Sequence, residues 1–221
     1  MFFKNKKERL KRKYPQSQNV EEYRSIGLNL NKIIKKNVIK SLTITSSVEG
    51  EGKTTAAVEL ARFYGEKENK KIIVIDCNSK NPSIIKQFNV DNKYGLWDFL
   101  MGNASLDNCI QKVNGYIDVV ELGLSKSDEV MTSQKLREIL DELSVHYELI
   151  IIDSPSVLES ADAEVISGQC DGTLLVINSN KSKRMQVLNA NEKLEKCGAN
   201  TMGIIVNDYK RGHFVDEKMF I

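Results

Sequence analysis

The residues best suited to chemistry form a short glycine-containing loop that follows an apolar stretch and precedes a helical pattern. The loop carries Gly50 and Gly52, and Lys53 and Thr54 come directly after them. Glycine tolerates positive φ angles, so successive backbone N–H groups can point at an anion, and the first turn of a helix adds the positive end of its dipole. Lys53 supplies a positive charge, and Thr54 stands where a phosphate-binding loop places the hydroxyl that binds Mg²⁺. The pattern predicts a site for ATP or GTP.

The loop departs from the strict phosphate-loop pattern at one position, because Ser47 stands where that pattern has glycine. The remaining pattern, glycine-x-glycine-lysine-threonine-threonine, is intact. The alternative is an ordinary glycine turn between a strand and a helix, followed by lysine and threonine by chance. The residues predicted to bind the nucleotide are Gly50, Glu51, Gly52, Lys53, Thr54 and Thr55.

Two aspartates end apolar runs and are expected near the loop. Residues 70–76 and 147–153 are runs rich in β-branched apolar residues, and they end in Asp76 and Asp153. Buried strands of a parallel sheet have this composition, and their carboxyl ends gather ligands at one edge. For Asp76 the alternative is that its side chain caps the following helix.

These groups together suffice for phosphoryl transfer, which depends mainly on positioning and on the stabilisation of charge. Lys53 and the loop amides would hold the β- and γ-phosphates, and Thr54 and Asp153 would position Mg²⁺. Asp76 would meet the metal or serve as the base that orders the nucleophile. The predicted catalytic residues are Lys53, Asp76 and Asp153, and the predicted metal ligands are Thr54, Asp76 and Asp153.

The elements that must position these groups alternate along the chain. Apolar runs predict six strands: 38–45, 70–76, 117–122, 147–153, 173–177 and 202–207. Apolar residues at helical spacing predict helices over 20–34, 54–64, 95–102, 105–110, 132–146, 161–168 and 182–196. Strands that alternate with helices predict βαβ units, and therefore an α/β fold with a doubly wound, mostly parallel sheet and helices on both faces.

Length and composition fit one domain, which we place at residues 20–207. The chain has 221 residues, of which 41% are hydrophobic, and this is enough for a sizeable core. No apolar run approaches the roughly 20 residues that a membrane span needs, and the N-terminus lacks the apolar core of a signal peptide. We therefore expect a cytoplasmic protein, with residues 208–221 as a C-terminal tail.

A basic arm, residues 1–19, precedes the predicted domain. Within residues 4–13, seven lysines and arginines stand against Glu8 alone, and Phe2 and Phe3 come before them. Such an arm can attach weakly to an anionic membrane surface, at about 1 kcal/mol per charge, and the alternative is a solvated tail. Because no aromatic platform or recognition helix lies nearby, we do not expect nucleic acid binding.

Five segments together resemble the CapB/CpsD-type bacterial tyrosine kinases of capsule and exopolysaccharide synthesis. That family lies within the deviant-Walker phosphate-loop group, which includes MinD and ParA. The resemblance runs from about residue 20 to Asn207. The segments are 21–24, 46–54, 73–82, 95–102 and 150–162.

The resemblance implies an autophosphorylating tyrosine kinase that uses Mg-ATP at the inner face of the cell membrane. It also implies a partner, the cytoplasmic tail of a membrane protein that controls polysaccharide chain length. By the same resemblance, Lys53 and Thr54 contact phosphate and Mg²⁺, and Asn207 contacts the adenine. Asp76 and Asp153 match the family's Walker A′ and Walker B aspartates.

Several positions depart from the family pattern near the expected metal. Glu49 and Ser156 stand where the family has proline, and Asn78 and Lys80 stand where its A′ motif has aspartate and arginine. Asn78 removes one negative charge from the metal region. Lys80 cannot reproduce a bidentate guanidinium contact.

Two further departures concern assembly and the phosphate acceptor. The oligomerisation pattern E-x-x-R-x-x-R is only partly present, with Glu21 and Arg24 in place and Gly27 where the second arginine is expected. The sequence therefore does not decide whether the chain forms a homo-oligomeric ring. The family's C-terminal tyrosine cluster is missing, since Tyr209 is the one tyrosine after Asn207.

Two other functions therefore stay open beside the kinase. One is a nucleotide-binding regulatory module with weak or absent kinase activity that docks on the membrane partner. The other is a MinD/ParA-like ATPase, which the sequence disfavours because Val48 replaces the signature lysine expected two residues before Gly50.

Overall fold

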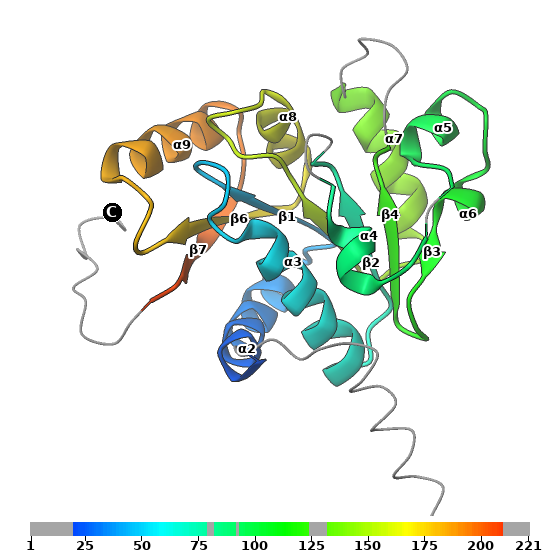
Figure 1. Cartoon of the computed structure of the whole chain (residues 1–221), viewed down its shortest axis with the longest axis horizontal. Helices are drawn as coiled ribbons and strands as arrows, with labels where there is room; N and C mark the ends of the chain where they lie inside the picture. The colour runs from blue at the N-terminus through cyan, green and yellow to red at the C-terminus, as the bar shows by residue number, and fades with distance from the viewer. Residues whose placement is uncertain (1–19, 79–81, 92, 124–131, 210–221) are drawn as a thin grey trace, which may run out of the picture.

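The centre of the molecule is a seven-stranded sheet, shown in Figure 1 by a computed structural model that describes residues 20–78, 82–91, 93–123 and 132–209. Its strands are β1 (Ser41–Ser46), β2 (Ile72–Asp76), β3 (Gln111–Lys112), β4 (Ile117–Glu121), β5 (Leu149–Asp153), β6 (Gly172–Asn178) and β7 (Thr201–Asn207). They lie in the order β3-β4-β2-β5-β1-β6-β7, and every neighbouring pair is parallel except β3 and β4. The predicted doubly wound, mostly parallel α/β fold is confirmed.

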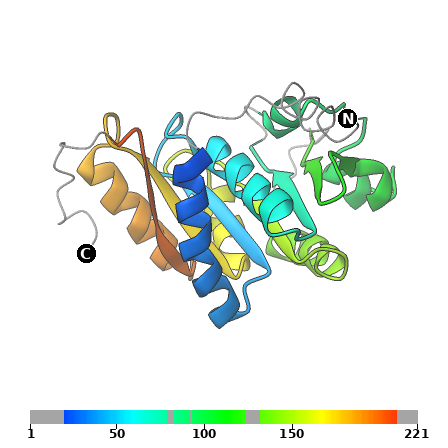
Figure 2. The ribbon, with the colours of Figure 1, turned by 90° about the horizontal axis from the view of Figure 1, so that it is seen from below.

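Helices cover both faces of the sheet. One face carries α2 (Val20–Asn37), α3 (Lys53–Arg62), its π-helical continuation η1 (Phe63–Lys67) and α4 (Ile84–Phe88). The other face carries α5 (Leu96–Leu100), α6 (Leu106–Cys109), α7 (Ser133–Ser144), α8 (Asp162–Gln169) and α9 (Arg184–Lys196). Figure 2 shows α2 and α3 side by side in front of the sheet, and the two helices also contact each other.

The central strand β2 illustrates how the sequence fixes these two layers. Ile72 and Val74 belong to the apolar cluster beneath α2 and α3, whereas Ile73 and Ile75 belong to the cluster beneath α7. Side chains alternate between the faces of a strand, and burial of each such side chain stabilises the fold by about 1.5–3 kcal/mol. The register of β2 is thus fixed, and with it the position of Asp76 at the strand's carboxyl end.

The structure corrects the predicted elements in three places. The prediction of six strands is wrong, because β3 adds a two-residue antiparallel strand beyond β4. The helix α4, five residues long, was not predicted either, and both elements are too short to show a period. Val38, predicted to open the first strand, instead lies before β1 with an exposed side chain and a φ of 55°.

Three predicted features fall outside the described residues: the basic arm 1–19, Lys80, and the tail from residue 210 onward. None of the helices in the described part of the chain combines the length and the hydropathy of a membrane span.

Candidate nucleotide-binding site

The predicted phosphate loop connects β1 to α3 at the carboxyl end of the sheet. Gly50 and Gly52 have φ angles of 80° and 100°, as expected for a loop that turns its N–H groups inward. A Cβ at Gly52 would lie 2.1 Å from Nδ2 of Asn207, so a larger residue there would displace the Asn207 side chain. The helix begins at Lys53, one residue earlier than predicted, so Lys53 and Thr54 lie in a first turn whose N–H groups lack helical partners.

Lys53 is almost fully buried, with 5% of its surface exposed. Its positive charge lowers the pKa of both Asp76 and Asp153, although burial outweighs this effect in each case. A buried ammonium group is costly unless anions compensate it. Lys53 therefore lies close enough to both predicted aspartates to act on their charge, in the first turn after the phosphate loop.

Thr54 and Asp153 meet directly, because Thr54 Oγ1 donates a hydrogen bond of 2.7 Å to Asp153 Oδ2. Asp153 is fully buried, and its Oδ1 has no hydrogen-bond partner among the described residues. Burial, followed by the charge of Asp76, raises the pKa of Asp153 to about 7 against the opposing effects of Thr54 and Lys53. A buried carboxylate oxygen without a protein donor is able to bind a cation or a water molecule.

Asp76 lies opposite Asp153 in the register of β2 and β5. Its Oδ1 accepts the N–H of Asn78 at 3.0 Å, and its Oδ2 accepts the N–H groups of Ser83 and Ile84 at 2.7 and 3.0 Å. Burial raises its pKa, and these N–H groups oppose the shift. Asp76 therefore does cap the start of α4, which also fixes its carboxylate beside the predicted metal site.

These residues fit a magnesium ion. Mg²⁺ prefers oxygen ligands and is usually bound through one or two carboxylates together with phosphate oxygens and water. The unpartnered Oδ1 of Asp153 and the hydroxyl of Thr54 are ligands of this kind, and Asp76 lies on the adjacent strand.

Glu51 was predicted to contact the nucleotide, but its side chain turns into the protein. Its carboxylate is fully buried and accepts hydrogen bonds from the hydroxyls of Ser47 and Ser182 and from the N–H of Val48. Only the backbone of Glu51 is therefore available to a phosphate. Thr55, by contrast, lies half-buried in the first turn of α3.

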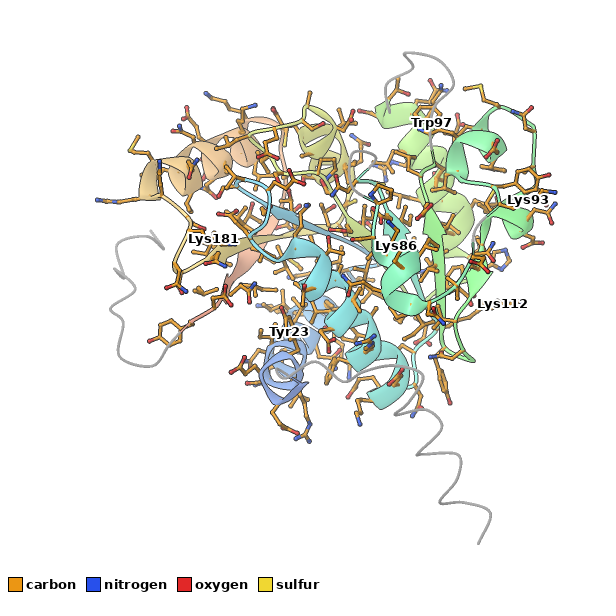
Figure 3. All side chains as sticks on the ribbon, in the orientation of Figure 1. Tyr23, Lys86, Lys93, Trp97, Lys112 and Lys181 are labelled. Carbon is orange, nitrogen blue, oxygen red and sulfur yellow. The ribbon has the colours of Figure 1, made fainter. Side chains whose placement is uncertain are left out.

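Asn207 ends β7 and reaches the phosphate loop, where its Nδ2 donates a hydrogen bond of 3.1 Å to the carbonyl of Glu51. A hollow of about 730 Å³ opens beside Asn207, between α2 and the end of β7. Its walls include the rings of Tyr23 and Tyr209 and the side chain of Ile26. Figure 3 shows Tyr23 on this side of the molecule. No sequence motif predicted the hollow, because its walls come from segments far apart in the chain.

Comparisons with known proteins agree with this geometry. The AAA domain family matches residues 37–201. Tyrosine-protein kinase YwqD of Bacillus subtilis (strain 168) is 33% identical over 199 residues, which cover 89% of this chain and 84% of YwqD. Tyrosine-protein kinase CpsD of Streptococcus agalactiae serotype III (strain NEM316) is 32% identical over 200 residues, covering 88% of this chain and 85% of CpsD. The chain belongs to the CapB/CpsD-type family of bacterial tyrosine kinases.

A solved structure extends the likeness from sequence to fold. The kinase domain of Escherichia coli tyrosine kinase ETK superposes with a TM-score of 0.81 at 28% identity, and the match covers 88% of this chain and 78% of the ETK chain. Membership in the CapB/CpsD-type family therefore rests on sequence and fold together.

The positions that depart from the CapB/CpsD-type pattern gather beside Lys53. A small hollow of about 20 Å³ is lined by Lys53, Glu49, Asn78 and Ser156, among others. Glu49 donates its N–H to Oε1 of Glu159 at 3.0 Å, which brings a second glutamate to the same place. Three of the four departures near the expected metal are thus neighbours in space, which their spacing in the sequence did not reveal.

The incomplete oligomerisation pattern of the family also has a structural basis. Glu21 and Arg24 form an exposed ion pair of 3.5 Å on α2. Gly27, one turn on, is buried against η1, and a Cβ there would lie 2.3 Å from the ring of Phe63. An arginine at residue 27 would collide with this ring, so the third position of the pattern serves helix packing in this chain.

Proposed function

We propose that this chain is a protein-tyrosine kinase that transfers the γ-phosphoryl group of ATP to a tyrosine hydroxyl, in a system of capsule or exopolysaccharide synthesis. The observation that carries the proposal is the arrangement around Asp153. This carboxylate accepts the hydrogen bond of Thr54, is affected by the charge of Lys53, and keeps one oxygen without a partner among the described residues. Family membership supports the same activity. The reaction converts ATP and tyrosine into ADP and phosphotyrosine and releases a proton.

In this proposal ATP lies along the carboxyl end of the sheet. Backbone N–H groups of residues 50–55 and the ammonium of Lys53 hold its phosphates. The adenine occupies the hollow beside Asn207, where the rings of Tyr23 and Tyr209 offer apolar faces to a flat base. The proximity of Asn207 to the phosphate loop supports this orientation.

Thr54 and Asp153 would hold Mg²⁺, with Asp76 beside them. When bound, the ion neutralises the charge that develops between the β- and γ-phosphates. Asp76, whose carboxylate is fixed by three backbone N–H groups, orients the tyrosine hydroxyl and accepts its proton. Lys53 stabilises the negative charge of the transferred group.

Tyr209 is the acceptor that we favour within the described residues. Tyr23, Tyr64 and Tyr147 are buried and Tyr94 is half-buried, whereas Tyr209 is 52% exposed and Tyr116 is 42% exposed. Tyr116 precedes β4 and so lies at the amino end of the sheet, opposite the site. Tyr209 follows the carboxyl end of β7, at the same edge of the sheet as the phosphate loop. Because it lines the adenine hollow and not the phosphate end of the site, it would accept phosphate from ATP bound to another copy of the chain.

The activating partner is proposed from the family resemblance to be the cytoplasmic tail of a polysaccharide co-polymerase in the membrane. The protein would then work at the inner face of the membrane. A second candidate function is a nucleotide-binding regulatory module with weak kinase activity. Asn78 and Glu49, which line the small hollow beside Lys53, favour this second candidate, because both change the charge around the transferred phosphate.

The test is phosphotyrosine mass spectrometry after incubation of the protein with Mg-ATP, with and without the partner tail. We expect phosphate on Tyr209, none in Tyr209→Phe, and a loss of about 10²-fold or more in Asp153→Asn. Nucleotide binding without phosphotyrosine under either condition would favour the regulatory module. Phosphate on another tyrosine would keep the kinase and reject the assignment of the acceptor.

A further inference from the structure

We propose that Glu51 is a positioning residue whose buried carboxylate holds the phosphate loop in its binding shape and ties it to the wall of the adenine hollow. This inference rests on the proposed nucleotide site, and it assigns a function to a side chain that the phosphate-loop pattern leaves unspecified. Glu51 is fully buried, although it lies between the two exposed or half-exposed glycines of the loop.

The carboxylate first closes the loop on itself. Ser47 Oγ lies 2.8 Å from both carboxylate oxygens of Glu51, and the N–H of Val48 donates to its Oε2 at 3.0 Å. Ser47 stands where the strict pattern has glycine, so its hydroxyl supplies a bond that glycine cannot make. Ser47 and Glu51, near the two ends of the loop, are thus held together.

The carboxylate also begins a chain of hydrogen bonds that returns to its own backbone. Ser182 donates its hydroxyl to Glu51 Oε1 and accepts the N–H of Asn178 at 2.7 Å. Asn178 Nδ2 donates to Asp208 Oδ2 at 2.6 Å, and the N–H of Asp208 donates to Asn207 Oδ1 at 3.0 Å. Asn207 Nδ2 closes the circuit at the carbonyl of Glu51.

This circuit joins the two halves of the proposed nucleotide site. Asn207 and Asp208 line the adenine hollow, and Glu51 lies inside the phosphate loop. The circuit is buried at Glu51 and Asn178 and reaches the surface at Asp208. A loop ordered before binding does not lose freedom when the ligand arrives. A ligand that contacts Asn207 or Asp208 therefore acts on the same network that shapes the phosphate loop.

The test compares Glu51→Gln, Ser182→Ala and the double variant for Mg-ADP affinity, and for melting temperature with and without Mg-ADP. We expect Glu51→Gln to lose about tenfold in affinity, or about 1.4 kcal/mol, and to gain correspondingly less stability from Mg-ADP. Ser182→Ala should lose severalfold. The double variant should lose little more than Glu51→Gln, because both changes weaken the same contact. Glu192→Gln, an exposed glutamate on α9, is the matched control and should bind as the wild type does.

The outcomes separate this inference from the proposed function. A Glu51→Gln variant that melts lower but binds Mg-ADP as tightly as the wild type would overturn the inference, since Glu51 would then be structural only. If Glu51→Gln does not fold, the half-buried Ser182 carries the test, and unchanged affinity in Ser182→Ala overturns it. A wild-type protein that fails to bind Mg-ADP would overturn the proposed function as well.

Discussion

Aspartates at the two ends of the parallel sheet differ in how their oxygens are satisfied. At the amino end, Asp171 Oδ2 accepts the N–H groups of Lys40 and Ser41, each at 2.8 Å, and the hydroxyl of Ser41 at 2.9 Å. Asp118, buried near the start of β4, accepts the hydroxyl of Tyr147 at 2.8 Å. Both of these carboxylates are paired within the protein.

At the carboxyl end, two buried carboxylates face each other and one oxygen is left over. Asp76 and Asp153 are partners in the register of β2 and β5, and Asp153 Oδ1 lacks a hydrogen-bond partner among the described residues. Burial of neighbouring like charges costs free energy. Among the aspartates, those at the amino end stabilise the protein by pairing within it, whereas Asp153 at the carboxyl end keeps one unpartnered oxygen beside the proposed nucleotide site.

The largest expected effect tests the carboxyl end through the buried Lys53. Lys53→Met keeps the apolar stem and removes the charge, so affinity for Mg-ATP should fall by about 10²-fold, while the fold is retained. Titration calorimetry measures the affinity, and circular dichroism checks the fold. Unchanged affinity in this variant would reject the phosphate-loop assignment.

The next effect tests the amino end by removing its paired aspartate. Asp171→Ala should lower the free energy of unfolding by about 2 kcal/mol, because three donors lose a charged acceptor. Mg-ATP affinity should stay within twofold of the wild type. Urea unfolding gives the stability, and Asp141→Ala, an exposed aspartate on α7, serves as the control. If Asp171→Ala lost as much Mg-ATP affinity as Lys53→Met, the proposed difference between the amino and carboxyl ends of the sheet would be wrong.

A smaller effect is expected at the second paired aspartate. Tyr147→Phe removes the hydroxyl that Asp118 accepts, and the free energy of unfolding should fall by about 1 kcal/mol without a change in nucleotide binding. Tyr116→Phe changes an exposed tyrosine just before the same strand and should alter stability by less than about 0.5 kcal/mol. Equal losses in the two variants would show that the buried pair contributes nothing of its own.

Much of this arrangement could be predicted from the sequence, because its signals are local. Apolar runs that end in Asp76 and Asp153 specify buried strands, and the strand order then brings their carboxyl ends together. The positive φ angles of Gly50 and Gly52 likewise follow from residue type. The elements α4 and β3 were not predicted, because five and two residues are too few to show a periodic pattern of apolar residues.

The features that the sequence did not predict depend on contacts between distant segments. Glu51 was expected to face the nucleotide, but its partner Ser182 lies 131 residues away, so no spacing could indicate the direction of its side chain. Gly27 interrupts a family pattern because Phe63 packs against it, and this contact exists only once α2 lies on η1.

The most direct test of the contrast between the two ends is the melting temperature of Asp153→Asn and wild type, each with and without Mg-ATP. Without ligand the variant should melt at the same temperature as the wild type or higher, because a buried carboxylate beside Asp76 has been neutralised. With Mg-ATP the wild type should gain stability and the variant should gain much less. A variant that melts lower than the wild type and gains as much from Mg-ATP would contradict the account, since Asp153 would then be a structural residue like those at the opposite end.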